Sequence, residues 1–346
     1  MSSSLMPLLP LLLNTAVGSK LCPSSCLCYE SSDLVDCGSG GLVRVPPGVP
    51  HGTWLLDLSG NKLTVIHSRS FLGLWSLKIL RMSNNSITTL EPQSLSSLQF
   101  LEKLDLSFNQ LRWLRQDFSQ SLSSLLELRL DHNLLEHLGP GSLGDLENLR
   151  KLDLSSNQIG AIDVRAFAGL SRLSFLSLEA NRLNVLEDGL LSRQQRLEVL
   201  LLSHNNISVI QTEALAPLWR LTLLGLRGNQ LDHIRFKTFL QLQTTSTELQ
   251  MSLNPWSCDC ELERVFNKIR HVRHLQVGDY SEIICHAPAQ QAGSCLAALH
   301  GRLCVAETAS VLVITITVTL AVIGALVKAE HKQKSKQAAS DAESER

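Results

Sequence analysis

The chain has 346 residues, of which 44% are hydrophobic and 18% are charged. Its 31 Lys and Arg side chains nearly balance 32 Asp and Glu side chains, which gives a formal net charge of −1. A chain without a basic excess is not expected to bind the phosphates of a nucleic acid.

A short apolar run, Leu5 to Leu13, begins the chain, and the small residues Ala16-Val17-Gly18 follow it. This order is typical of a secretory signal peptide, although no positive charge precedes Lys20. The run is too short to span a bilayer. We predict a signal peptide over residues 1–18, cleaved after Gly18.

Four cysteines come next, in the spacing C-x3-C-x-C-x8-C: Cys22, Cys26, Cys28 and Cys37. Disulfides persist in secreted chains, so this cluster predicts disulfides rather than a zinc site. Four cysteines allow three pairings, and the spacing alone does not choose among them. We expect residues 19–50 to form an N-terminal cysteine-rich cap.

Asparagine recurs at an interval of 24 residues through the middle of the chain. The positions five and three residues before it are apolar in every repeat, as at Leu56 and Leu58, and those two and five residues after it are apolar in the first eight. The recurring residues are Asn61, Asn85, Asn109, Asn133, Asn157, Asn181, Asn205, Asn229 and, after 25 residues, Asn254. This period and the frame LxxLxLxxNxL are the leucine-rich repeat signature.

The alternating leucines predict one strand per repeat, and strands stacked about 4.8 Å apart form a parallel sheet. The expected fold is an α/β solenoid, a horseshoe with a concave parallel sheet, built of eight full repeats and a partial ninth over residues 51–253. In the convex return half of each predicted repeat, a second pair of apolar positions recurs. Polar residues interrupt this pattern at Ser119 and at Gln194. We interpret the asparagines as structural, because their amides can satisfy backbone groups of the neighbouring turn.

Two sequons predict N-glycosylation, at Asn84 in Asn84-Asn85-Ser86 and at Asn206 in Asn206-Ile207-Ser208. Both follow a predicted strand at the turn that leaves it. A glycan at either position would therefore occupy one rim of the predicted horseshoe.

The strand positions that face solvent form rows of alternating charge. One row is Asp57, Arg81, Asp105, Arg129 and Asp153, and the other contains Lys103, Glu127 and Lys151. Self-pairing of these exposed ions, worth less than about 1 kcal/mol each, is the favoured interpretation. The alternative is a polar docking surface for a protein.

The same exposed columns become apolar further along the chain. Contiguous apolar side chains on a polar face often mark an interaction site. The predicted contact residues are Phe175, Val199, Leu201 and Leu223, with Glu179 and Arg227 at the edge.

A second cysteine cluster follows the last repeat, and residues 254–304 are expected to form a C-terminal cap. Its members are Cys258, Cys260, Cys285, Cys295 and Cys304. Cys295 is the ninth cysteine of the chain. We favour a buried free thiol there over an intermolecular disulfide, and a pairing of Cys295 with Cys260 is a further alternative.

Thr308 to Val327 contains no charged residue, and as a helix it would be about 30 Å long, enough to span a bilayer. Lys328, Lys332, Lys334 and Lys336 follow it, and the positive-inside rule places them in the cytoplasm. We predict a single-pass type I protein of the plasma membrane, with extracellular repeats and a cytoplasmic tail over residues 328–346.

Repeats flanked by two cysteine clusters resemble extracellular leucine-rich repeat membrane proteins, and the resemblance covers residues 22 to 327. In that family the four cysteines of each cap pair first with third and second with fourth. The resemblance therefore implies the disulfides Cys22–Cys28, Cys26–Cys37, Cys258–Cys285 and Cys260–Cys304, with Cys295 unpaired.

The same resemblance implies a binding function, because the family includes adhesion proteins, receptors and accessory subunits of potassium channels. We expect the concave face to bind an extracellular or membrane protein. The alternative is a cis accessory subunit of a membrane protein such as a potassium channel, because Cys304 lies so close to the predicted span that no stalk remains. No nucleophile–base pair, paired carboxylates or metal-ligand spacing stands out, so neither catalysis, a cofactor, a metal nor a small-molecule substrate is expected.

Overall fold

The computed structural model describes residues 22–344, except residues 30, 32, 243 and 300. The predicted signal peptide, residues 1–18, lies outside these residues. The chain divides into two compact units. The first contains the residues up to Leu183 together with Gly189–Leu200, and the second contains Asn184–Asp188 and the residues from Leu201 onward.

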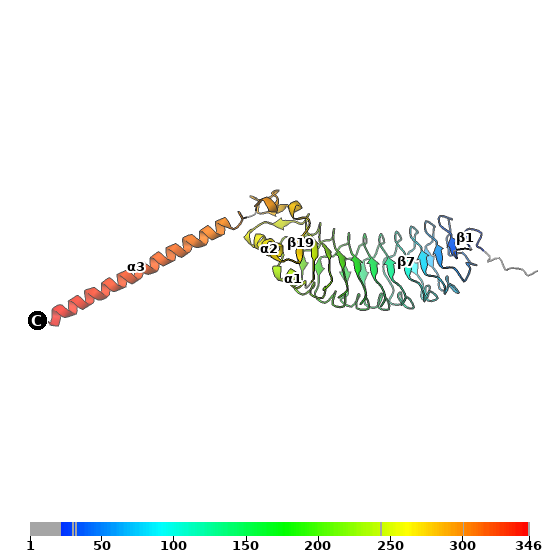
Figure 1. Ribbon diagram of the computed structural model, residues 1–346, viewed down its shortest axis with the longest axis horizontal. Helices are drawn as coiled ribbons and strands as arrows, with labels where there is room; N and C mark the ends of the chain where they lie inside the picture. The colour runs from blue at the N-terminus through cyan, green and yellow to red at the C-terminus, as the bar shows by residue number, and fades with distance from the viewer. Residues whose placement is uncertain (1–21, 30, 32, 243, 300, 345–346) are drawn as a thin grey trace, which may run out of the picture. The chain divides into compact units, whose positions relative to one another are not determined.

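The first unit is a stack of turns whose short strands form one sheet, drawn side by side in Figure 1. In sheet order these strands are β1 (Leu27–Tyr29), β2 (Leu34–Asp36), β3 (Leu55–Asp57), β5 (Ile79–Arg81), β7 (Lys103–Asp105), β8 (Glu127–Arg129), β10 (Lys151–Asp153) and β12 (Phe175–Ser177). Strand β14 (Val199–Leu201) begins in this unit. Only the pair β1–β2 in this list is antiparallel. The other neighbours are parallel, and from β3 onward they pair residues one repeat apart, as for Leu80 and Leu104. The predicted parallel-sheet solenoid is confirmed.

The return side of these turns carries shorter strands. They are β4 (Val65–Ile66), paired with β6 (Thr89–Leu90), and β9 (His137–Leu138), paired with β11 (Ala161–Ile162). Between the two faces the leucine columns are buried, as at Leu56 and Leu104. Hydrophobic burial therefore comes from stacking one turn on the next, since a single turn leaves its leucines uncovered.

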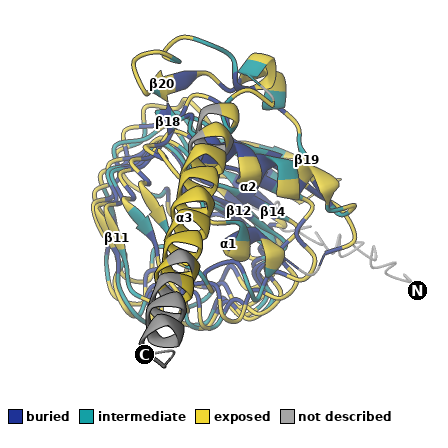
Figure 2. Cartoon of the chain, turned by 90° about the vertical axis from the view of Figure 1, so that its left-hand side faces the viewer, coloured by how far each residue is buried: buried dark blue, intermediate teal, exposed yellow. Residues whose placement is uncertain are grey.

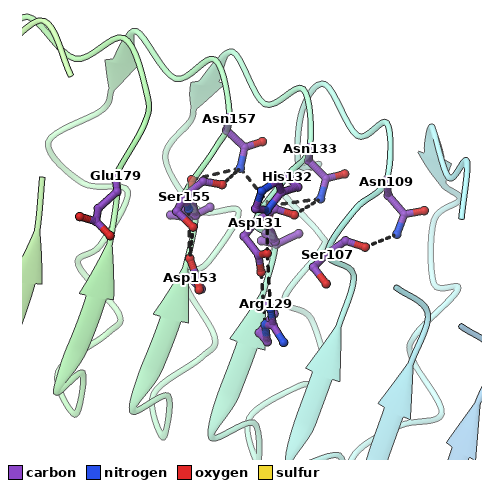
Figure 3. A network of polar contacts seen from close by, with 12 residues as sticks. Ser107, Asn109, Arg129, Asp131, His132, Asn133, Asp153, Ser155, Asn157 and Glu179 are labelled. Atoms are coloured by element: carbon purple, nitrogen blue, oxygen red, sulfur yellow. Dashed lines mark hydrogen bonds and ion pairs between the residues drawn. The ribbon is translucent and has the colours of Figure 1, made fainter. Parts of the chain in front are cut away.

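The recurring asparagines lie inside the turns and bond to backbone groups, which confirms their structural role (Figure 3). Asn109 is buried, and its Nδ2 donates to the carbonyl oxygens of Met82, 2.9 Å away, and Leu106, 3.0 Å away. Its Oδ1 accepts from the backbone N of Ile87 at 2.9 Å. Each asparagine therefore satisfies backbone groups of its own turn and the preceding one.

The two polar residues that interrupt the apolar pattern of the return side, Ser119 and Gln194, are buried and have hydrogen-bond partners. The Ser119 hydroxyl lies 3.3 Å from Asp145 Oδ2 and accepts from the Asp145 backbone N. Gln194 Nε2 donates to the Phe167 carbonyl oxygen at 2.7 Å. The mismatch is thus absorbed by side-chain hydrogen bonds.

The second unit continues the same architecture and adds helices. Its strands β16 (Leu223–Gly225), β17 (Thr247–Gln250) and β19 (Leu275–Val277) are parallel neighbours, and β13 (Val185–Leu186) pairs with β15 (Val209–Ile210). The remaining elements are α1 (Phe236–Leu240), β18 (Trp256–Ser257), α2 (Cys260–His271), the 3-10 helices η2 (Tyr280–Glu282) and η3 (Leu296–Leu299), β20 (Cys285–Ala287) and α3 (Val305–Ser344).

Helix α2 covers the end of the leucine columns of this unit. The Asp259 side chain caps its first turn by accepting from the Leu262 backbone N at 2.8 Å. On its inner face Phe266 is buried and packs edge-on against Trp256, with ring centroids 5.6 Å apart. The amphipathic helix therefore seals the stack with aromatic side chains.

Four disulfides join the cysteines in the pairs that the family resemblance implies. They are Cys22–Cys28, Cys26–Cys37, Cys258–Cys285 and Cys260–Cys304. Cys295 is a free thiol, and its Sγ lies 3.2 Å from the Ser281 carbonyl oxygen. We expected a buried thiol, but Cys295 is half-buried, at the residue before η3.

Helix α3 is 40 residues long and continues past the lysines that follow the predicted span. Its segment Val311–Glu330 is long and apolar enough to cross a membrane, and its side chains are exposed (Figure 2). This segment overlaps the predicted span of residues 308–327.

Candidate protein-binding surface

The solvent-facing charges of the first unit pair with one another across neighbouring strands. Arg81 lies 3.4 Å from Asp57, and Arg129 lies 3.8 Å from Asp105. In the second row Glu127 binds two lysines, Lys103 at 3.5 Å and Lys151 at 3.3 Å. The favoured interpretation of these rows, self-pairing, is confirmed.

The pairing shifts the pKa of Glu127. Partial burial of its carboxylate would raise the pKa, but the hydrogen bond and charge of Lys151 and the charge of Lys103 outweigh that effect. The pKa of Glu127 therefore lies below its ordinary value, and the carboxylate remains ionised at neutral pH.

Arg129 lies at the centre of a polar network at the ends of β8 and β10 (Figure 3). Besides Asp105, it binds the buried Asp131 through Nε at 3.2 Å, and His132 Nδ1 lies 3.0 Å from the other oxygen of Asp131. Burial would lower the pKa of Arg129, but the carboxylates of Asp131, Asp105 and Asp153 raise it. The sequence did not predict the partner Asp131, because it belongs to the turn after the strand.

Two of the predicted apolar contact residues, Phe175 and Val199, belong to the first unit and are half-buried. The Lys151 ammonium lies 5.4 Å from the centroid of the Phe175 ring. This distance is that of a cation–π contact. Because Lys151 also pairs with Glu127, the aromatic ring is in contact with the charged row. Phe175 therefore lies where the charged row gives way to apolar side chains, with Glu179, also half-buried, at the end of its strand.

The other two, Leu201 and Leu223, belong to the second unit and are also half-buried. Leu201 Cδ2 lies over Gly225, 3.4 Å from the place that a Cβ would occupy there. Arg227 lies 3.4 Å from Glu282 in η2, so this predicted edge residue binds the C-terminal cap. The structure thus divides the predicted contact residues between the two units.

A group of exposed aromatic residues, which was not predicted, lies on the rim where the chain enters the strands. Trp75 is 57% exposed and Phe100 is 60% exposed, and Trp54 is also exposed. A shallow hollow there is lined by Trp75, Ser76, Lys78, Phe100, Glu102, Ser124 and Leu126. The available signal was Phe100, at a position that is polar in the other repeats, as at Ser76 and Ser124.

A second unpredicted hollow lies on the return side of the turn that follows Asn109. Trp113 is exposed there and Leu114 is only half-buried, at a position that is buried at Leu90 and at Leu138. Within the described residues no return strand is assigned to this turn, unlike its neighbours β6 and β9.

Both predicted glycosylation sites are exposed. Asn84 follows β5, and Asn206 lies between β14 and β15. Each side chain is therefore accessible on the folded protein.

A family model described as leucine rich repeat matches residues 55–111, 101–159, 123–183 and 171–231. Together these ranges cover residues 55–231, just over half of the chain. The chain belongs to the leucine-rich repeat family. This family and its fold are those of protein-interaction scaffolds that are typically not catalytic.

Similar proteins share parts of the repeat region. Leucine-rich repeat-containing protein 3 of Danio rerio is 41% identical over 78 residues, which are 22% of this chain and 29% of that protein. Leucine-rich repeats and immunoglobulin-like domains protein 3 of Mus musculus is 39% identical over 69 residues, which are 20% of this chain and 6% of that protein. The chain therefore spans less than a third of either relative.

A crystal structure of human 5T4 (Wnt-activated inhibitory factor 1, trophoblast glycoprotein) is similar over a longer stretch. It matches with a TM-score of 0.59 and 26% sequence identity, covering 81% of this chain and 96% of that one. This similarity agrees with the solenoid architecture and the disulfides at the two ends.

The described residues contain no group of three or more His, Cys, Asp or Glu side chains placed to hold a metal ion. His271 Nδ1 lies 2.6 Å from the Asn267 carbonyl oxygen in the last turn of α2. The solvent-facing side of the strands, called the strand face below, carries a row of paired charges beside apolar side chains. This arrangement is suited to binding a protein surface.

Proposed function

We propose that this chain is a single-pass cell-surface protein whose repeats bind an extracellular protein through the strand face, without catalysis. The observation that carries the proposal is the change of this face from paired charges to apolar side chains at Phe175. Large apolar side chains next to satisfied charges are typical of the centre and rim of a protein interface.

Phe175 is suited to anchor such a partner because its ring is already held. Lys151 lies over the ring, and Glu127 holds Lys151 in turn. A side chain fixed before binding loses less conformational entropy when the partner arrives. The charges around it set the orientation of the partner more than they add affinity.

The proposed placement in the plasma membrane, with extracellular repeats, draws on both ends of the chain. Disulfides persist in oxidising compartments, which favours a secretory route for the repeats. The candidate span Val311–Glu330 precedes Lys332 and Lys334, which favours a cytoplasmic position for the tail.

A second function, as a cis accessory subunit of another membrane protein, is supported by the start of α3. The helix begins at Val305, directly after Cys304 of the last disulfide. With no stalk between cap and helix, the protein is better placed to contact neighbours in its own membrane than to reach another cell.

Proximity labelling on intact cells, with the full chain, tests the proposed function. The double variant Phe175→Asp with Val199→Asp, both in the first unit, should lose the specifically labelled partner while it still reaches the surface. Val164→Asp, at an exposed valine on the return side, is the matched control. Unchanged labelling by the double variant would contradict the strand-face proposal.

The two modes of binding are then separated with two further proteins. If a soluble ectodomain ending at Cys304 binds target cells, the partner is recognised in trans. If only the membrane-embedded protein acts, and replacing residues 308–346 abolishes its effect, the accessory role is supported.

A further inference from the structure

Phe108 occupies a backbone conformation that large side chains rarely adopt. Its φ is +52°, in the left-handed region, and its side chain is 49% exposed. The same position in other turns is held by Gly60, Asn84, His132, Ser156 and Ala180, all with positive φ. A strained, exposed phenylalanine costs stability, and such positions are often retained for a function.

One face of the Phe108 ring is occupied. The ring stacks on His132, the equivalent residue of the next turn, with centroids 4.0 Å apart and planes 11° apart. His132 is held by Asp131, with Nδ1 3.0 Å from Oδ2. At these two successive turns the side chains at this position therefore stack face to face.

The other face of the ring is on the side of Asn84, the equivalent residue of the preceding turn. Asn84 N donates to the Ser107 carbonyl oxygen at 3.0 Å, and Asn85 N donates to the Phe108 carbonyl oxygen at 3.2 Å. Neighbouring turns of such a sheet lie about 4.8 Å apart. Asn84 is exposed, so a group attached to its side chain would lie beside the open face of Phe108.

We propose that Asn84 carries an N-linked glycan whose first N-acetylglucosamine packs against the open face of Phe108. The apolar C–H face and the acetamido methyl of this sugar suit an aromatic ring, and the stack with His132 keeps that ring in place. The inference rests on the proposed extracellular position of the repeats, because the modification occurs in the secretory pathway.

The transfer itself requires a lipid-linked oligosaccharide diphosphate as donor. The Asn84 Nδ2 forms a bond to C1 of the first sugar and gives up one proton. The bond between that C1 and the diphosphate oxygen breaks, and the lipid diphosphate leaves. No oxidant or reductant takes part.

Asn206 provides a control in the same chain. It is exposed and begins a sequon, but the equivalent residue in the following turn is Gln230 rather than an aromatic residue. The residue 24 positions after Asn206 therefore offers no ring to a sugar at Asn206.

The experiment uses the full chain made in mammalian cells, with mass spectrometry of the peptides containing Asn84 and Asn206. Glycan release by peptide-N-glycosidase F under native conditions should be slower at Asn84 than at Asn206. Phe108→Asn, which tolerates the left-handed turn and creates no sequon, should speed release at Asn84 about fivefold, the factor expected for one aromatic contact. Release at Asn206 should not change.

A direct signature comes from NMR of the protein with isotope-labelled glycans. The acetamido methyl of the first sugar at Asn84 should show an upfield ring-current shift that disappears in Phe108→Asn. Faster release at both sites would indicate misfolding of the variant. The upfield shift in the wild-type protein would then decide whether the Phe108 ring contacts the sugar.

Three results would overturn the inference. A glycan at Asn206 with none at Asn84 would overturn this inference and leave the proposed extracellular position unaffected. Sugar at neither site would overturn it together with the proposed extracellular position. A glycan at Asn84 with no upfield shift, and with the same release rate in Phe108→Asn, would show that the ring does not hold the sugar.

Discussion

Two ladders of polar side chains run along the first unit, and they differ in what they contact. The asparagine ladder is buried, and Asn133 bonds to the carbonyl oxygens of Leu106 and Leu130 and to the backbone N of Leu111. The charged ladder lies at the surface and is exposed or half-buried, and its members bond to side chains of a neighbouring strand, as Arg81 does to Asp57. Both repeat every 24 residues, so periodicity alone does not distinguish a structural ladder from a surface one.

The two ladders differ in what they contribute to stability and to function. Backbone groups left without partners inside a protein cost far more than a lost surface ion pair. The asparagine ladder therefore tolerates little change, whereas the charged ladder can vary and give way to apolar side chains at Phe175. The following predictions test this contrast in order of decreasing effect.

Asn133→Ala should lower the free energy of unfolding by roughly 3 kcal/mol or more, because it leaves buried backbone groups of three residues without partners. Denaturation in urea measures the change. Asn148→Ala, at a surface amide that donates to the Ser123 carbonyl oxygen and accepts from Arg172, is the matched control and should cost about 1 kcal/mol or less. Equal losses from the two variants would contradict the structural role of the buried ladder.

Phe175→Asp should weaken partner binding by at least about thirtyfold, which corresponds to the 2 kcal/mol of an interface hot spot. Its half-buried position means that stability should change much less than in Asn133→Ala. Titration of the partner identified by labelling measures the affinity, and Val164→Asp serves as control. An affinity loss equal to that of the control would place the interface elsewhere, with the rim of Trp75 and Phe100 next to be tested.

Glu127→Gln should lower stability at pH 7 by less than about 1 kcal/mol, because the pair is partly exposed and screened by solvent. The folded-state pKa of Glu127 is depressed, so its contribution is present above the unfolded value of about 4.3 and is lost as pH falls through the folded pKa. Urea denaturation at pH 7, 5 and 3 should therefore show the gap between the two proteins narrowing as the pH falls. Glu147→Gln, at an exposed carboxylate, is the control, and a gap that does not narrow at acid pH would refute the ion-pair explanation.

Arg81→Ala should have the smallest effect, about 0.5 kcal/mol or less, since a single exposed pair with Asp57 is lost. The change should shrink further in 1 M salt, where charges are screened within about 3 Å. Unfolding midpoints at low and high salt measure it. A loss as large as that of Asn133→Ala would remove the distinction between the two ladders.

Features set by the repeat period could be predicted from the sequence. Equivalent residues 24 apart become neighbours in adjacent turns, so the leucine columns, the role of Asn109 and the pairing of Arg129 with Asp105 follow from spacing. The disulfide pairs came from family resemblance instead, because spacing allows three pairings in each cluster. The half-buried state of Cys295 was not predicted, since it depends on how η3 packs.

The stacking of repeats follows from the amino-acid sequence, because each turn has an apolar face that a neighbouring turn must cover. Which exposed side chains contact one another depends on the folded structure. Lys151 lies over Phe175, His132 stacks on Phe108, and Trp75 and Phe100 line one hollow. The physical reason is that the period fixes which Cα atoms are adjacent, whereas side-chain rotamers and the turns outside the strands determine the contacts that a partner or a glycan would use.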